Sequence, residues 1–95
     1  MKNIEIAKEE LKREIAILDN TRKMYLKTTY EIIEREGSSS PGVKLMQRLI
    51  DDVDIQSREA RIILKNNAML CDEDFLDMVK NHFVANGFST IWKYK

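Results

Sequence analysis

The stretch IEIAKEELKREIAILDNTRKMYLKTTYEII, residues 4–33, carries apolar side chains at helical spacing over its whole length. Five of them recur every seven positions, so with about 3.6 residues per turn they stay on one side of an α-helix. They are Ile4, Leu11, Leu18, Tyr25 and Ile32, and the same stripe takes in Ala7, Ile15 and Ile33. Residues 19–21 compete for backbone hydrogen bonds, but the stripe stays in phase across them. The pattern predicts one helix over about residues 3–36.

The same helix carries a second apolar line on nearly the opposite side, made of Ile6, Ile17 and Met24. An amphipathic helix needs only one apolar face to pack into its own core. The second line therefore indicates that this protein recognises another chain. The alternative is that the third helix or the C-terminal segment covers this face within the same molecule.

A short loop, GSSSPG at residues 37–42, follows the long helix. Gly37 can adopt the left-handed conformation that ends a helix. Ser40 and Pro41 form a start signal, because the hydroxyl caps the next helix and the proline ring already has the helical φ. So short a loop predicts that the two flanking helices run antiparallel.

The second helix is expected over about residues 41–66. Its core stripe comprises Val43, Met46, Leu49, Ile50, Val53, Ser57, Ala60 and Leu64. Ser57 and Ala60 are small, so a neighbouring element can approach closely there. Ile55 and Ile62 lie seven residues apart on the far side, and this helix therefore repeats the two-faced pattern of the first.

A shorter third helix is expected over about residues 72–86, with Asp72 as its N-cap and Gly87 at its end. Its apolar side holds Phe75, Leu76, Val79 and Phe83. Residues 88–95, FSTIWKYK, alternate as a strand does and predict an extended C-terminal tail with Trp92 and Tyr94 on one face. The tail can pack on the bundle, pair with a second copy or pair with a partner. The predicted fold is all-α, a small helical bundle that can dimerise.

Composition limits the classes of function. The chain has 95 residues, enough for one small domain, and its 16 basic residues balance 16 acidic ones. The balance also holds within each segment, which disfavours nucleic-acid binding because no basic footprint for a phosphate backbone is present. No apolar run in the sequence reaches the length of about 18 residues that is needed to span a bilayer. The charged N-terminus lacks the apolar region of a signal peptide, so we expect a cytoplasmic protein.

No pattern of catalytic, cofactor-binding or metal-ligating residues emerges. His82, the single histidine, has no clear partner along its own helix, so a surface or partly packed side chain is expected. Cys71 has no second cysteine to pair with, and a small buried or half-buried thiol is expected. The acidic run at 51–54 fails as a calcium loop, because Ser57 and Ile63 stand where glycine and glutamate are needed. We expect no enzyme, no cofactor and no metal.

The sequence predicts a small non-enzymatic protein that binds a larger protein, as phage or mobile-element inhibitors and immunity proteins do. The expected partner-binding residues are Ile6, Ile17, Met24, Ile55, Ile62, Trp92 and Tyr94. A structural homodimer or assembly subunit would use the same faces, and a nucleic-acid-associated regulator is the weaker alternative. In size, helical content and extended C-terminal end, the chain resembles the bacteriocin immunity proteins of Gram-positive bacteria, and the segment 41–49, PGVKLMQRL, is the nearest local similarity. The resemblance implies an antiparallel helical bundle that protects a producing cell from its own peptide toxin.

Replacing both Ile17 and Met24 with glutamate tests the second line of the first helix. Two carboxylates on a partner-binding face should abolish binding or dimerisation while leaving helicity largely intact. Circular dichroism measures the helicity and light scattering measures the mass. A collapse of helicity and folding would instead assign this face to the protein's own core.

Overall fold

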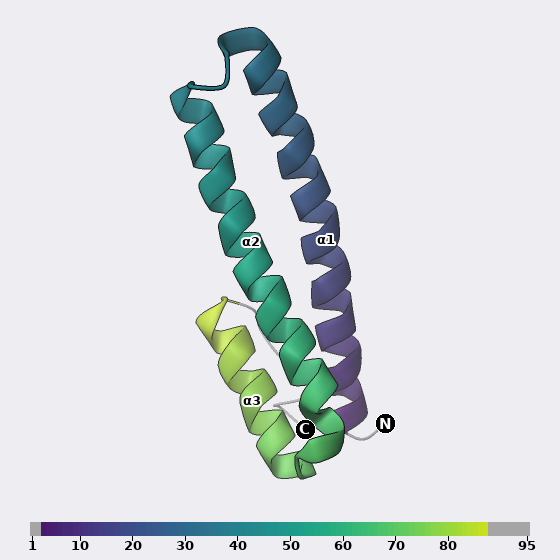
Figure 1. Cartoon of the computed structure of the whole chain (residues 1–95). Helices are drawn as coiled ribbons and strands as arrows, with labels where there is room; N and C mark the ends of the chain where they lie inside the picture. Colours follow the sequence, from purple (N-terminus) through teal and green to yellow (C-terminus); the bar gives the residue numbers. More distant parts are fainter. Residues whose placement is uncertain (1–2, 88–95) are drawn as a thin grey trace.

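The computed structural model describes residues 3–87, which form three α-helices joined by short connections (Figure 1). Helix α1 spans Asn3–Glu36, α2 spans Pro41–Lys65 and α3 spans Asp72–Ala85, with a short 3₁₀ segment, η1 (Asn66–Met69), between α2 and α3. The molecule is elongated, 50 × 23 × 18 Å, because α1 and α2 lie side by side along their length. The predicted all-α hairpin with a short third helix is confirmed. The expected tail at 88–95 lies outside the described residues.

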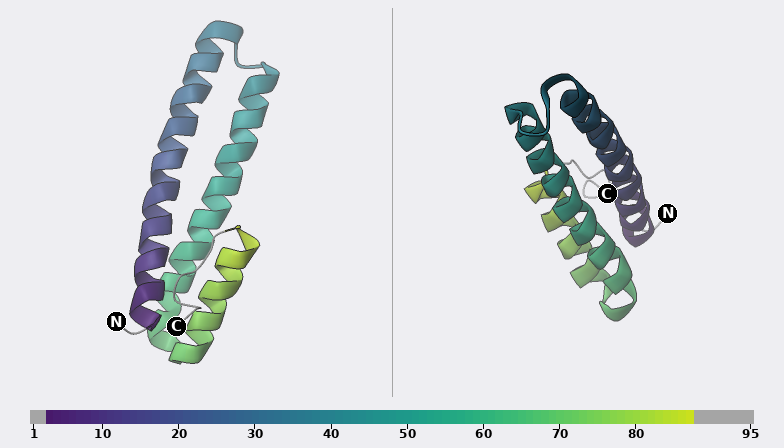
Figure 2. Two further views of the ribbon diagram at one scale, coloured as in Figure 1. Left: turned by 180° about the vertical axis from the view of Figure 1, so that it is seen from behind. Right: turned by 45° about the horizontal axis from the view of Figure 1, so that its top comes forward.

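The turn between α1 and α2 is built as the sequence predicts. Gly37 has a φ of +89°, a left-handed conformation that residues with a Cβ rarely adopt, and its N–H donates to the Ile33 carbonyl. Ser40 Oγ accepts a hydrogen bond from the Gly42 N–H at 3.2 Å, and Pro41 opens α2. Together the end signal and the start signal reverse the chain, so α1 and α2 run antiparallel (Figure 2).

Helix α1 is continuous through residues 19–21, as the in-phase stripe predicts. Thr21 Oγ1 donates to the Ile17 carbonyl at 2.8 Å, so the hydroxyl is satisfied within the helix. Asp19 is held across the hairpin instead, where its two oxygens accept hydrogen bonds from Arg61 Nη2 at 3.0 and 2.9 Å. Asp19 and Thr21 thus have partners that do not compete with the amide hydrogens of the helix.

The main core cluster lies where α3 packs against the end of the hairpin that holds the N-terminus (Figures 1 and 2). Phe75, Val79 and Phe83 of α3 are fully enclosed there, as their spacing predicts. They pack with a cluster from the two long helices, Ala7, Leu11, Ala60 and Ile63. The alanines have no exposed surface, and their small side chains let the helices approach closely. Burying each large side chain contributes about 1.5–3 kcal/mol, which makes this cluster the main apolar contact of α3.

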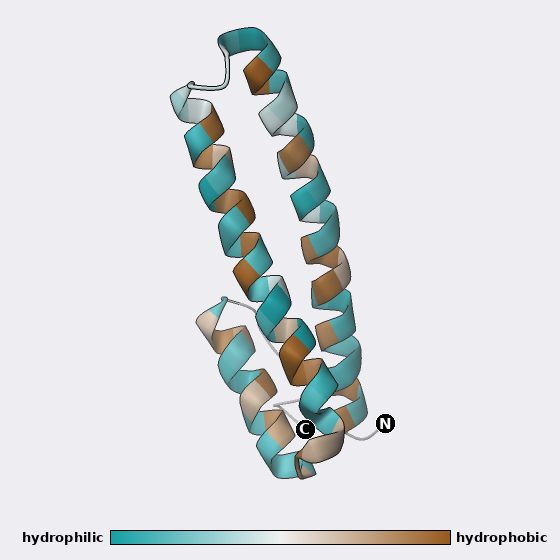
Figure 3. Cartoon of the chain, in the orientation of Figure 1, coloured by the Kyte–Doolittle hydropathy of each residue, from teal (hydrophilic) through white to brown (hydrophobic). Residues whose placement is uncertain are grey.

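Beyond the end of α3, the described part of the molecule is two helices thick. Its core is the inward stripe of the hairpin, formed by Leu18, Thr29, Val43, Met46, Ile50 and Val53. Figure 3 shows the corresponding apolar bands recurring along both long helices. Arg22 Nε and Asp54 Oδ1 form an exposed ion pair across the helices at 2.8 Å, which contributes less than about 1 kcal/mol. Stability in this half therefore comes from the apolar stripe.

Several details of the sequence interpretation are corrected. Cys71, not Asp72, is the N-cap of α3, and its thiol is exposed and not buried. Ile63 belongs to the core because α3 packs against that side of α2, whereas Leu49 and Leu64 are half-buried. Helices α2 and α3 each end one residue before the predicted boundary.

Alanine substitution of two glycines tests the turn. Gly37→Ala should lower the free energy of unfolding by about 1–2 kcal/mol, because a Cβ is strained at this φ although nothing lies within 4 Å of it. Gly42→Ala should raise it by about 0.5 kcal/mol, because Gly42 is helical and the nearest contact of a new Cβ, to Ile32, is an ordinary 3.4 Å. Urea denaturation measures both. Effects of the same sign would contradict this account of the turn.

Candidate functional site

His82 of α3 is buried, with 2% of its surface exposed, so the expectation of a surface or partly packed histidine is wrong. Its Nδ1 lies 2.6 Å from Glu59 Oε1 of α2. Its Nε2 lies 2.9 and 2.8 Å from the two carboxylate oxygens of Glu14 on α1. We call Glu14, Glu59 and His82 the histidine clamp. A single ring thus joins all three helices.

The two carboxylates of the clamp have different surroundings. Glu14 is 2% exposed and lies in the inward stripe of α1, where Gln56 Nε2 of α2 also donates to its Oε2 at 2.9 Å. A carboxylate removed from water needs such donors, and Gln56 and His82 supply them. The Glu59 side chain is 51% exposed, so water reaches that end of the clamp. Water therefore cannot replace the hydrogen-bond donors of Glu14, whereas it can replace those of Glu59.

The short contacts of the clamp set its hydrogen count. Each contact between a ring nitrogen and a carboxylate oxygen needs one hydrogen between the two atoms. A neutral imidazole carries one N–H and an imidazolium carries two. Two arrangements satisfy both contacts: an imidazolium between two carboxylates, or a neutral imidazole with one carboxylic acid.

This arrangement suits positioning better than catalysis or metal binding. The His82 side chain has no exposed surface, so a substrate would have no access to the ring. Glu14 and Glu59 lie at different ring nitrogens and do not converge on one point. Among residues 3–87, no group of three His, Cys, Asp or Glu side chains could hold a metal ion.

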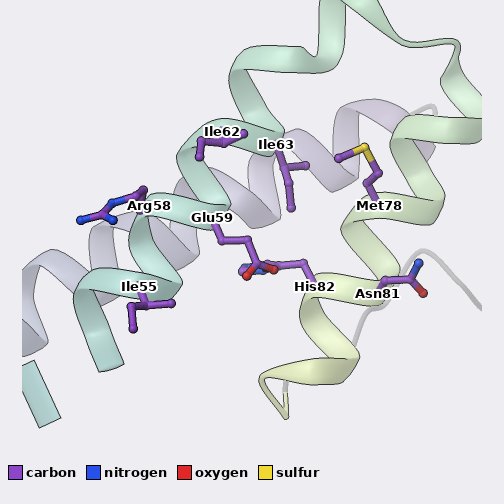
Figure 4. A pocket seen from close by; sticks show the side chains of 8 residues that line it. All are labelled: Ile55, Arg58, Glu59, Ile62, Ile63, Met78, Asn81 and His82. Carbon is purple, nitrogen blue, oxygen red and sulfur yellow. The ribbon is translucent and has the colours of Figure 1, made fainter. Parts of the chain in front are cut away.

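A groove of about 520 Å³ runs between α2 and α3 beside the clamp (Figure 4). Its lining is mixed apolar and polar, and consists of Ile55, Arg58, Glu59, Ile62, Ile63, Met78, Asn81 and His82. In Figure 4 the Glu59 and His82 side chains point toward each other from the two helices. Ile55 is 60% exposed and Ile62 is 51% exposed, so α3 lies beside these isoleucines and does not cover them.

The structure separates the predicted partner-binding residues. It brings Ile55 and Ile62 together in the groove. Ile17 and Met24 are exposed on α1 but do not line this groove. Ile6 is half-buried and packs against the core cluster. The tail residues, Trp92 and Tyr94, lie outside the described part of the chain.

The rim of the groove is charged. An adjoining polar hollow shares Arg58 and Ile62 with the groove. Its other charged members include Asp19 and Arg61, which pair with each other at 2.9 Å. Within residues 3–87, the structure pairs Arg58 with no carboxylate, which leaves this guanidinium available to a partner.

The sequence interpretation missed the histidine clamp, although two signals for it were present. Glu14 occupies an inward position of α1, between Leu11 and Leu18 of the seven-residue stripe. His82 follows Phe75 by seven residues, which places it on the inward side of α3. An acid and the single histidine, both at inward positions, predict a buried pair because neither is stable there alone.

The comparisons with known proteins are negative: no protein-family model, curated protein or solved structure matches this chain. None of the helices in the described part of the chain has the length and apolar character needed to cross a bilayer. The groove and the clamp are therefore the features from which a function can be inferred.

Alanine substitution distinguishes the two carboxylates of the clamp. Glu14→Ala should lower the free energy of unfolding by about 3–5 kcal/mol, because it leaves the buried His82 ring and the half-buried Gln56 amide without their shared acceptor. Glu59→Ala should cost about 1 kcal/mol, because water can replace an exposed carboxylate. Chemical denaturation measures both values. A larger loss at Glu59 than at Glu14 would contradict this account of the site.

Proposed function

We propose that this chain is a non-enzymatic protein that binds a larger protein, as an inhibitor or an immunity protein does, through the groove between α2 and α3. The observation that carries the proposal is the exposure of Ile55, Ile62 and Met78 along one groove. Single exposed aliphatic residues are ordinary on protein surfaces. A set of them gathered in a hollow beside polar groups is typical of a binding site.

The shape of the groove fits an amphipathic helix of the partner. Ile55 and Ile62 are seven residues apart on α2, which separates them by about 10 Å along the helix axis. A partner helix with apolar residues two turns apart would match this spacing. Met78 faces them from α3, and its unbranched side chain can adapt to the shape of an incoming residue.

The free energy of association indicates that the contact extends beyond the groove. Ile55, Ile62 and Met78 are already partly covered, so complete burial adds about 1 kcal/mol for each. Association costs at least about 4 kcal/mol in lost translational and rotational freedom. Three residues therefore do not sustain a tight complex, and the partner has to reach further contacts. Arg58 on the rim is the nearest candidate, because arginine is common at the energetic centres of interfaces.

Glutamate substitution in the groove tests the proposal. The double variant Ile55→Glu, Ile62→Glu should bind the partner with at least tenfold lower affinity, because two carboxylates would lose their water in an apolar contact. Leu45→Glu is the matched control, since Leu45 lies on the same helix, is 56% exposed and does not line the groove. Affinity capture from the native host, followed by quantitative mass spectrometry, compares the proteins retained by the three chains.

The proposal requires a protein that the unmodified chain and the Leu45→Glu variant retain and the double variant loses. Equal retention by all three chains would contradict it. A photo-crosslinking residue at position 55 should join the chain to the same protein, whereas one at position 45 should not. Light scattering separates the homodimer alternative, which predicts twice the monomer mass for the chain alone and the monomer mass for the double variant.

A further inference from the structure

We infer that the occupant of the groove is an acidic amphipathic helix, whose carboxylates pair with Arg58 and Lys65 of α2. The inference rests on the proposed function, because it names the class of partner that binds the same groove. It adds the charge of the partner and the spacing of that charge along the partner helix.

Two lines of side chains run next to each other along α2. Ile55 and Ile62 form the apolar line, and Arg58 and Lys65 form the basic line. Each cation follows its isoleucine by three residues, so both cations lie on the same side of the apolar line. Within each line the spacing is seven residues, or about 10 Å along the helix axis. A partner helix that lies along the isoleucines therefore lies along the cations as well.

The basic line lies on the side of the isoleucines that is away from α3. Arg58 and Ile62 line both the groove and the adjoining polar hollow, and Lys65 lines the hollow. The hollow also includes Asp19 of α1, so it lies on the α1 side of the isoleucines, whereas the groove lies on the α3 side. Figure 4 shows the Arg58 side chain extending from α2 away from α3. A helix seated on the isoleucines thus has Met78 on one flank and the cations on the other.

The two cations are available to a partner because the neighbouring acids already have partners. These pairs are Asp19 with Arg61 at 2.9 Å, Asp54 with Arg22 at 2.8 Å, and Glu59 with His82 at 2.6 Å. Within residues 3–87, neither Arg58 nor Lys65 is paired with a carboxylate, and both side chains are exposed. Met78 and Asn81, which α3 adds to the groove, carry no charge. The unpaired charge at the groove is therefore basic, and an acidic partner complements it.

The basic line ends where the groove ends. Asp51 stands seven residues before Arg58, at the next position of the same line, and it lines neither the groove nor the polar hollow. The partner is therefore expected to carry two acids, seven residues apart, opposite Arg58 and Lys65. A carboxylate suits both, because the arginine fork binds its two oxygens and the lysine ammonium pairs with it as a point charge.

Two synthetic helical peptides test the inference with the complete chain. Both carry leucine at every seventh position, and they differ only at two positions beside the leucines, which are glutamate in one peptide and lysine in the other. The acidic peptide should bind about tenfold more tightly at low ionic strength, because it gains two ion pairs where the basic peptide meets two like charges. This preference should shrink at about 0.5 M salt, which screens exposed charges. Fluorescence anisotropy measures both affinities.

Charge reversal of the basic line is the decisive variant. Arg58→Glu, Lys65→Glu should reverse the preference, so that the basic peptide binds more tightly. The milder Arg58→Gln, Lys65→Gln should remove the preference without reversing it, which keeps the test valid if the reversal lowers the stability of the fold. Lys23→Glu, Lys27→Glu on α1 is the matched control, since it changes the total charge equally at exposed positions that do not line the groove. This control should keep the preference for the acidic peptide.

The failure of this inference can be told apart from a failure of the proposed function. Equal affinity for the two peptides would overturn the inference, and the proposed function would stand if Ile55→Glu, Ile62→Glu abolished the binding of both. Binding of neither peptide would also overturn the inference, and the capture experiment above would then decide on the proposed function by itself. A short DNA duplex that bound more tightly than the acidic peptide, and bound the isoleucine variant equally well, would overturn it too, because the cations would then serve a phosphate backbone.

Discussion

A carboxylate inside an apolar interface needs hydrogen-bond donors. The buried Glu14 of α1 therefore constrains how the other two helices pack against α1. Gln56 has to reach it from α2 and His82 from α3, so both helices are held in one register relative to α1. The apolar contacts of α3 alone would tolerate small displacements along the hairpin. Buried polar contacts do not, because a displacement leaves a donor or an acceptor without a partner. We interpret the clamp as a source of specific alignment more than of stability, since an apolar replacement of such a group is often at least as stable.

The alignment of α3 also creates the groove. Met78 and His82 are four residues apart and therefore share one side of α3. On α2, Glu59 stands four residues after Ile55 and three before Ile62, so these three share one side as well. When the clamp brings Glu59 and His82 together, the neighbouring apolar residues are placed on the two walls of one groove. Neighbouring turns of α2 and α3 thus form both the polar contact and the apolar groove.

Local patterns were sufficient to predict the helices, because an apolar stripe and its end signals act within a few residues. Gly37, Ser40 and Pro41 determine where the chain reverses, and Phe75 shows which side of α3 is buried. The clamp could not be predicted from local patterns, since Glu14 and His82 are 68 residues apart and no periodicity relates them. Glutamate and histidine are both common on solvated surfaces, so neither residue type alone predicts burial. The pair becomes predictable only when the inward position of both residues is considered together.

The second apolar lines of the two long helices differ in exposure because of where α3 packs. Helix α3 packs against both α1 and α2, where its apolar residues join the core cluster and His82 reaches both Glu14 and Glu59. In that position Ile6 packs at the edge of the core cluster, while Ile55 and Ile62 remain beside α3. A shift of α3 that covered these isoleucines would draw His82 away from Glu14 and leave a buried carboxylate short of a donor. The exposure of Ile55 and Ile62 is therefore linked to the position of α3 in which the buried acid keeps its donor.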